Sequence, residues 1–238
     1  AHSSFKKCAS IMGLPDSGLI KVNTDINGRM DIVHLKQTFE NCILEGKKIF
    51  AVVATLGTTM RGAIDSIKDI SQLCKERNIW LHIDGSIGGI FALTNISIDG
   101  LCNVDRSNSI TINPQKILGI TKTSSLLVVS DFRKLNDAFS TGLPYIASSD
   151  DYVQKGEIGV QGSRPAEVIK LWLSLRFLGM YGIEAILNSS LERKSYFEEY
   201  INKDKYDIYS GPLHIISLLP KGMNKVNSDL WTKKIRKE

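Results

Sequence analysis

The sequence contains little of what would place it among metal-binding, disulfide-bonded, secreted or membrane proteins. Its four cysteines lie far apart, and no two of them form a C-x-x-C motif for a metal or a redox centre. No run of about eighteen apolar residues is present, and no charged and then apolar leader opens the chain. We therefore expect a reduced cytoplasmic protein that has no metal site and does not span a membrane.

The excess of charge of one sign is also small. The chain has 30 basic and 25 acidic residues, and its densest basic run, WTKKIRKE at the C-terminus, is explained by a solvated helix end. Nucleic-acid binding requires a concentrated basic face, so no nucleic-acid partner is expected. The first residues, AHSSFKK, already follow a helical pattern, and the last ones have no obvious cap. Both ends look cut, and we expect a piece of a longer polypeptide.

Segments with helical periodicity alternate with short apolar segments over residues 1–130. Helices are expected at 5–12, 32–44 and 66–77, and strands at 19–22, 49–54, 79–83, 109–112 and 125–129. This alternation predicts an α/β fold with a mainly parallel central sheet that is covered by helices. Apolar residues make up 42% of the 238 residues, which is enough for one sizeable domain or for one domain and part of another.

The pattern changes after residue 140. Residues 140–162 are polar and have little periodicity, which is typical of a lid or a binding loop. Beyond the loop, helices are expected at 165–178, 183–202 and 226–238, and strands at 206–210 and 213–219. We therefore interpret residues 1–180 as part of a large domain. Residues 181–238 are interpreted as the beginning of a small α+β C-terminal domain.

Polar clusters follow three of the predicted strands. They are GTT at 57–59, DGS at 84–86 and NPQK at 113–116. In parallel α/β sheets, ligands bind beyond the carboxyl ends of the strands. We therefore expect hydroxyl groups, a carboxylate and an amine to converge on one site at that edge of the sheet.

Lys116 lies between two apolar strands that we expect to be buried. An unpaired ammonium is costly to bury, so an inward lysine should be bonded to something. A lysine imine with pyridoxal phosphate is a standard solution. That cofactor also needs an anion near its pyridine nitrogen, and Asp84 at the end of a hydrophobic strand would suit. A surface lysine at 116 and a helix cap at 84 are the alternative interpretations.

Several motifs together resemble one enzyme family. AVVATLGTTMRGAIDSIKDISQLCKERNIWLHIDGSIGG, then NPQK, the opening AHSS and the later GVQGSRPAEVIKLWLSLRFLG are similar to the group II pyridoxal-phosphate-dependent amino-acid decarboxylases. The resemblance covers nearly the whole chain. It implies that residues 1–180 are the C-terminal part of a fold type I large domain that binds pyridoxal phosphate. It also implies a homodimer and the conversion of an L-amino acid to an amine and carbon dioxide.

The resemblance also implies roles for single residues. Lys116 matches the lysine that binds the cofactor as an imine, and Asp84 matches the aspartate that pairs with the pyridine nitrogen. His2 falls where a histidine stacks on the cofactor ring and contacts the substrate carboxylate. These three residues are the expected centre of the site.

Further positions match the surroundings of the cofactor. Thr59 matches a threonine near the polar edge of the ring, Ser86 a small residue beneath the ring, and Asn113 an asparagine near the phosphate. Tyr152 lies in the region of the family's catalytic loop, whose tyrosine returns a proton to the substrate carbon. Tyr145 is a rival for that role.

The sequence departs from the family in two respects. Gln115 replaces the usual histidine before the lysine, and glutamine does not titrate near neutral pH. A phosphate-binding loop that the family has upstream of AHSS is absent from this sequence, so either the numbering starts inside a longer protein or another chain supplies the loop. A different fold type I carbon–carbon lyase and a catalytically impaired, cofactor-binding relative are the alternatives to a decarboxylase.

Overall fold

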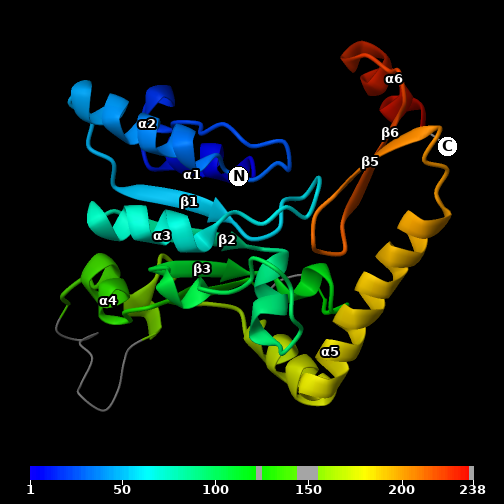
Figure 1. The fold of residues 1–238 in the computed structure, drawn as a ribbon. Coiled ribbons are helices and arrows are strands. Elements are labelled where there is room, and N and C mark those ends of the chain that lie inside the picture. The colour runs from blue at the N-terminus through cyan, green and yellow to red at the C-terminus, as the bar shows by residue number, and fades with distance from the viewer. Residues whose placement is uncertain (122–124, 144–154, 236–238) are drawn as a thin grey trace.

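A computed structural model describes residues 1–121, 125–143 and 155–235 (Figure 1). Its main sheet has four strands in the order β1-β2-β3-β4. The strands are β1 (Ala51–Thr55), β2 (Trp80–Gly85), β3 (Ser109–Ile112) and β4 (Leu126–Val129). The first three strands are parallel, and β4 is antiparallel to β3. The predicted mainly parallel sheet is confirmed.

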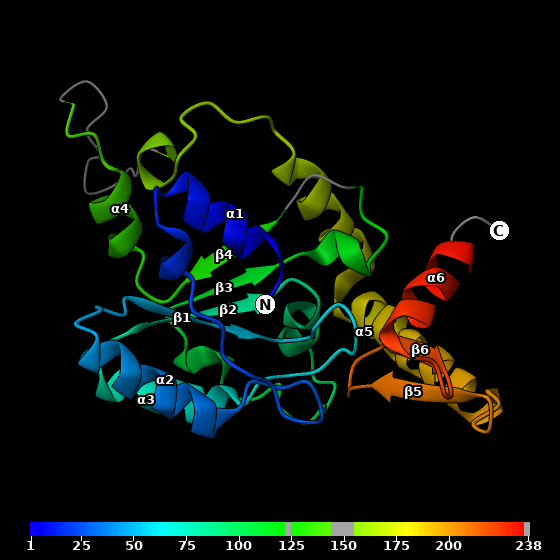
Figure 2. The same ribbon diagram turned by 90° about the horizontal axis from the view of Figure 1, so that it is seen from above.

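Helices cover both faces of this sheet (Figure 2). They are α1 (Ser4–Ile11) on one face and α2 (Ile32–Leu44) and α3 (Ile67–Glu76) on the other. The helix α2 begins where it does because the Asp31 carboxylate accepts hydrogen bonds from the backbone N–H groups of Val33 and His34, at 2.8 and 3.1 Å. Asp31 is therefore the N-cap of α2.

The main hydrophobic core lies between the sheet and the helices α2 and α3. Each helix buries one stripe, because apolar residues recur three or four positions apart. The stripes consist of Leu35, Phe39 and Cys42 on α2 and of Ile67, Ile70, Leu73 and Cys74 on α3. Except for Cys42, which is buried beside them, these residues belong to the same core cluster as the inward side chains of β1 and β2. This packing fixes the two strands whose ends carry the site.

The C-terminal third forms a separate two-stranded sheet at the end of a long helix (Figure 1). Its elements are α5 (Val168–Tyr200), β5 (Tyr206–Ser210), β6 (Ile216–Pro220) and α6 (Lys225–Ile235). The short helix α4 (Arg133–Phe139) follows β4 and lies beside the main sheet. The two helices predicted around residue 180 are parts of α5, which is broken at Gly179 by a left-handed φ of 59°. The division into domains at residue 180 stays a prediction.

Two predicted strands differ from the structure. Residues 19–22 form no strand, and Leu19 and Ile20 are exposed. The prediction was wrong because β propensity reflects packing on a half-buried surface, which the exposed Leu19 and Ile20 do not have. The strand at 125–129 exists as β4, but Leu127 and Val128 are 58% and 51% exposed rather than buried. As the edge strand, β4 pairs with a neighbour on one side only.

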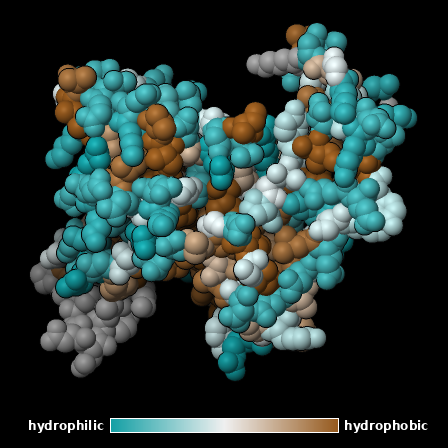
Figure 3. Space-filling view, in the orientation of Figure 1, coloured by the Kyte–Doolittle hydropathy of each residue, from teal (hydrophilic) through white to brown (hydrophobic). Residues whose placement is uncertain are grey.

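The surface of the molecule mixes hydrophilic and hydrophobic side chains (Figure 3). Hydrophobic residues gather in several places on the face shown, with hydrophilic residues between them. Large apolar side chains are also exposed on α5, among them Trp172 and Phe177. Within residues 1–121, 125–143 and 155–235, no helix combines the length and apolarity that a membrane span requires.

Candidate active site

The carboxyl ends of the three parallel strands meet at one edge of the sheet. Asp84 lies at the centre of that edge, because it pairs in register with Thr55 on β1 and with Thr111 on β3. The polar segments 57–59, 84–86 and 113–116 all leave the sheet there. Both ribbon views place the amino terminus beside the same edge (Figures 1 and 2). The strand ends that carry these clusters lie at the same edge of the sheet, as predicted, and the convergence of the side chains on one site stays a prediction.

Asp84 is a buried carboxylate, 6% exposed, that is held by the turn after β2. Its Oδ1 atom accepts hydrogen bonds from the backbone N–H of Ser86 at 3.2 Å and from the Ser86 hydroxyl at 2.6 Å. Gly85 between them is required for space, since a Cβ atom there would lie 2.8 Å from the carbonyl oxygen of Thr111. Oδ2 accepts no hydrogen bond from the described part of the chain, and it can receive a donor from a ligand.

Lys116 follows β3 in a single 3₁₀ turn, Pro114–Lys116. Pro114 and Leu118 are buried by this turn, whereas Lys116 is exposed. The expectation of an inward lysine was therefore wrong. The turn directs the proline and the leucine into the core, and the lysine keeps its ammonium in water without a desolvation cost. Its predicted position at the carboxyl edge of the sheet, one strand away from Asp84, agrees with the structure.

Two amide oxygens next to Lys116 are buried without a partner among the described residues. They are Oδ1 of Asn113 and Oε1 of Gln115. Asn113 donates a hydrogen bond from Nδ2 to the Ser125 hydroxyl at 2.9 Å. If the Asn113 amide rotates by half a turn, Ser125 can donate to Oδ1 instead, and the NH₂ group is then free to bind an anion.

Thr58 and Thr59 follow β1 in a tight turn. The Thr58 hydroxyl accepts a hydrogen bond from the backbone N–H of Ala63 at 3.1 Å, and the Thr58 carbonyl oxygen accepts one from Gly62 at 2.7 Å. Thr58 therefore closes the turn. Thr59 is exposed at the tip, with its hydroxyl unbonded within the described residues. Of the two threonines, Thr59 is the one available to a ligand.

Asp65, which holds the base of this turn, was not predicted from the sequence. Asp65 is buried, and its two carboxylate oxygens accept hydrogen bonds from the backbone N–H groups of Met30 at 2.6 Å and Thr55 at 2.7 Å. Burial raises the pKa of Asp65, and the two N–H groups oppose that effect. An aspartate inside the apolar stretch GAIDSI was the available signal, because buried carboxylates must be hydrogen-bonded.

Leu213, from the segment between β5 and β6, was also missed. Its side chain is fully buried against the turn after β1. A Cβ atom at Gly57 would lie 2.6 Å from Cδ1 of Leu213, and the φ of 98° at Gly57 also favours glycine. No sequence signal links these two residues, because they are far apart in the chain.

His2 is exposed at the start of α1. Its Nδ1 atom accepts a hydrogen bond from the backbone N–H of Ser4 at 3.2 Å and lies 2.9 Å from the Ser4 hydroxyl. Because a backbone N–H can only donate, the ring proton of neutral His2 lies on Nε2. The histidine therefore presents an N–H group away from the helix.

Residues 1–210 match the sequence model of the pyridoxal-dependent decarboxylase conserved domain. The chain belongs to this family. Acidic amino acid decarboxylase GADL1 of Bos taurus is 32% identical over 85% of this chain and 40% of its own length. L-2,4-diaminobutyrate decarboxylase of Rhizobium meliloti is 30% identical over 92% of this chain and 45% of its own length. The chain thus spans less than half the length of these curated relatives.

Solved structures show the same fold. Mouse CSAD superimposes with a TM-score of 0.80 at 28% identity, over 89% of this chain and 45% of that one. Oryza sativa TDC with PLP and tryptamine gives a TM-score of 0.89 at 19% identity, over 98% of this chain and 51% of that one. The predicted fold type I α/β architecture and the resemblance to group II decarboxylases are confirmed.

The cofactor of the family is pyridoxal phosphate, and the donor set of this decarboxylase domain fits it. A protonated pyridine nitrogen needs a carboxylate oxygen without a donor, which Oδ2 of Asp84 offers. An aldehyde needs a primary amine, which Lys116 carries at the same edge. A phosphate needs N–H donors, and the buried Asn113 amide can present two. The predicted cofactor agrees with the family and with these groups.

Part of the predicted site cannot be placed. Tyr152 and its rival Tyr145 lie outside the described residues. The described ends of their loop are joined, since the buried Glu157 accepts hydrogen bonds from the backbone N–H of Thr141 at 2.5 Å and from its hydroxyl at 3.1 Å. Hydrogen bonds from Thr141 lower the pKa of Glu157 and favour its charged form. Thr141 and Glu157, which lie on either side of the loop in the sequence, are therefore held together.

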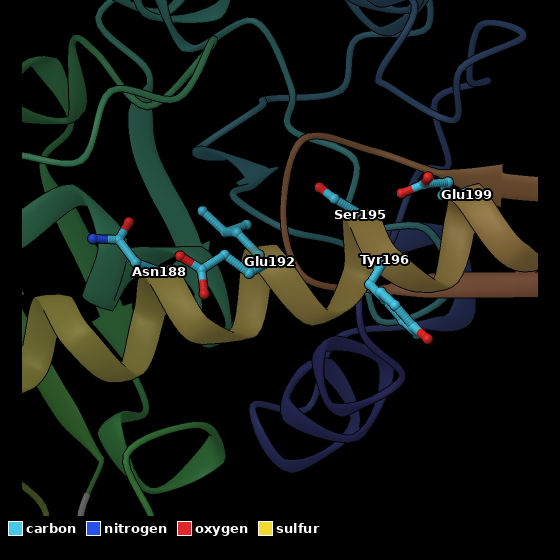
Figure 4. Close-up of a pocket in the computed structure, with 6 residues that line it drawn as sticks. Asn188, Glu192, Ser195, Tyr196 and Glu199 are labelled. Atoms are coloured by element: carbon cyan, nitrogen blue, oxygen red, sulfur yellow. The ribbon is translucent and has the colours of Figure 1, made fainter.

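A separate surface cavity of about 520 Å³ lies along the C-terminal half of α5 (Figure 4). It is lined by Asn188, Leu191, Glu192, Ser195, Tyr196 and Glu199. All of these residues come from one helix, and none comes from the strand ends that carry Asp84 and Lys116. This cavity is therefore distinct from the candidate active site.

Proposed function

We propose that this chain catalyses the pyridoxal-phosphate-dependent removal of the α-carboxyl group of an L-amino acid, which gives an amine and carbon dioxide. The observation that carries this proposal is the buried Asp84 at the centre of the carboxyl edge, one strand away from Lys116, in a chain of the decarboxylase family. The names of the relatives refer to acidic, aromatic and diamino acids as substrates. The proposal therefore does not specify the side chain of the substrate.

The chemistry divides between the cofactor and three residues. The bound cofactor supplies an electron sink for the electron pair of the breaking bond. Asp84 keeps a proton on the ring nitrogen, because a nearby anion favours the cationic form of the ring. Lys116 would hold the cofactor covalently through its primary amine. His2 stacks on the ring and orients the substrate carboxylate through its Nε2–H group.

The remaining roles are proposed from the resemblance. Thr59 would contact the polar edge of the ring, Ser86 would lie beneath the ring, and Asn113 would donate to the phosphate. Tyr152 returns a proton to the α carbon after carbon dioxide has left. The support for Tyr152 is its position in the sequence of the catalytic loop.

We further propose that the protein works in the cytoplasm as a homodimer, or with another chain that supplies a phosphate-binding loop. The partly exposed edge strand β4 and the exposed aromatic residues of α5 support such an assembly. The four cysteines are unpaired, which supports a reducing compartment. Residues 1–180 would bind the cofactor, and residues 181–238 would begin the small domain.

Product analysis tests this proposal. The protein is incubated with pyridoxal phosphate and a panel of acidic, aromatic and diamino L-amino acids, and carbon dioxide and amine are both quantified. Borohydride reduction and peptide mapping should place the cofactor on Lys116. Asp84→Asn should still bind the cofactor but lose most turnover, since asparagine cannot hold a proton on the ring nitrogen, whereas the exposed Asp99→Asn serves as a control. Cofactor colour without carbon dioxide release from any substrate would indicate an impaired relative instead.

A further inference from the structure

A row of polar side chains runs along β2 and β3 toward Asp84. Side chains alternate between the two faces of a strand, so Trp80, His82 and Asp84 share one face of β2. Ser109 and Thr111 lie on the same face of β3, opposite His82 and Asp84 in the register of the two strands. We call Trp80, Ser109, His82 and Thr111 the polar row. The function proposed above assigns it no role.

The hydrogen bonds of the polar row have a fixed direction. The indole N–H of Trp80 can only donate, and it donates to the Ser109 hydroxyl at 2.9 Å. The other partner of this hydroxyl in the described part of the chain is Nδ1 of His82 at 2.8 Å. Ser109 is buried, so its proton needs an acceptor, and Nδ1 is the acceptor within reach.

The direction of these bonds settles the protonation of the imidazole. If Nδ1 accepts from Ser109, the single proton of neutral His82 lies on Nε2. Nε2 then donates to the Thr111 hydroxyl, which is 3.3 Å away. A second proton on Nδ1 would point at the Ser109 hydroxyl and leave the serine proton buried without an acceptor. The polar row therefore opposes protonation of His82.

The surroundings of His82 agree with a neutral ring. Burial lowers the pKa of His82, and the charge of Asp84 acts in the opposite direction. From α1, the ring of Phe5 packs against the imidazole at 6.0 Å between centroids. From β1, the register partner of His82 is Val53. The residues shown to contact or pair with His82 from α1, β1 and β3 are uncharged, namely Phe5, Val53, Ser109 and Thr111.

We propose that His82 is a positioning residue, which Ser109 holds neutral with its proton on Nε2, so that the charge of Asp84 stays available to the ring nitrogen of the cofactor. An imidazolium at this place would pair with Asp84 and compete with the protonated pyridine. This inference rests on the proposed function, since it concerns how Asp84 serves the cofactor.

The first experiment observes the imidazole directly. Histidine labelled with nitrogen-15 is incorporated into the protein, and the signals of His82 are assigned with the His82→Gln variant. We expect a neutral ring with the proton on Nε2 at neutral pH. In Ser109→Ala the pKa of His82 should rise, and both neutral tautomers should appear. A proton on Nδ1, or a charged ring at neutral pH in the unmodified protein, would overturn the assignment.

The second experiment measures cofactor affinity by absorbance. In Ser109→Ala, affinity should fall about tenfold between about pH 8 and pH 6, the effect of coupling of one pKa unit. The unmodified protein and Ser109→Thr, which restores the hydroxyl, should change much less. Thr111→Val is the matched control, because it leaves the bond from Ser109 to His82 intact. Equal losses in Ser109→Ala and Thr111→Val at every pH would show that the polar row is only structural.

Two substitutions of His82 itself cover the case in which Ser109→Ala does not fold. His82→Lys places a permanent cation beside Asp84 and should weaken cofactor binding at every pH, whereas the neutral His82→Gln should retain it. Equal affinities of these two variants would refute the proposal. A protein with the predicted His82 signals and cofactor affinities that releases no carbon dioxide would support this inference and overturn the proposed function.

Discussion

The buried carboxylate of Asp65 connects the end of β1, next to the candidate site, to the backbone of Met30. Its two oxygens accept backbone hydrogen bonds of 2.6 and 2.7 Å from Met30 and Thr55. Asp65→Asn keeps one acceptor and replaces the other with an NH₂ group, which then faces a backbone N–H group. One hydrogen bond to a charged acceptor is lost. Two buried N–H donors then face each other without an acceptor between them.

The cost can be estimated from these contacts. A hydrogen bond to a charged group contributes about 1.5–3 kcal/mol, and an unsatisfied buried donor costs about 1–3 kcal/mol. Removal of the buried charge offsets part of this loss, because burial raises the pKa of Asp65. We therefore expect Asp65→Asn to lower the free energy of unfolding by about 2 kcal/mol. For a chain of this length, the melting temperature should fall by about 4–8 °C.

Urea unfolding followed by circular dichroism, with and without cofactor, measures this change. Asp99→Asn is the matched control, because Asp99 is exposed and its substitution should change stability by less than about 0.5 kcal/mol. If Asp65→Asn is as stable as Asp99→Asn, the backbone bonds of Asp65 do not hold the turn after β1. A loss of stability with unchanged cofactor affinity would show that the hydrogen bonds of Asp65 serve folding alone.

Three further predictions concern the core, the pH dependence and the loop. Leu213→Ala should lower the free energy of unfolding by about 3 kcal/mol through a buried cavity, whereas Leu127→Ala on the exposed edge strand should cost less than about 1 kcal/mol, as measured in urea. Burial lowers the pKa values of both His82 and His214 below 6.5 in the folded protein. As the pH drops below 6.5, these histidines are protonated more readily in the unfolded chain than in the folded one, so the free energy of unfolding should fall. Equal stability at pH values above and below 6.5 would contradict this. Tyr152→Phe should still form carbon dioxide but yield less amine, and equal amounts of both products at the normal rate would assign the proton donor elsewhere.

Much of the fold could be predicted because local patterns and tertiary structure agree over residues 30–112. The start of α2 follows from the capping preference of Asp31, and the positions of α3 and β2 follow from their periodicity. Parallel pairing then brings the carboxyl ends of β1, β2 and β3 to one edge. The place of Asp84 at that edge required no further information.

Side-chain direction in the turns could not be predicted in the same way. Lys116 was expected to point inward because it lies between two apolar segments, yet the 3₁₀ turn buries Pro114 and Leu118 and exposes the lysine. Residues 19–22 had the composition of a strand but no neighbour to pair with. In both cases the outcome depends on the geometry of the connection rather than on the pattern of residues.

The turn that carries Thr59 depends on residues from the far end of the chain. Leu213 fills the space above Gly57, Arg61 lies 4.5 Å from the ring centroid of Tyr209, and Ser217 donates a hydrogen bond to the backbone next to Thr59. These contacts are of different kinds, apolar, cation–π and hydrogen-bonded, and all come from the β5–β6 hairpin. Loosening this hairpin should therefore alter the position of Thr59 before it alters Asp84, which the central strands hold on both sides.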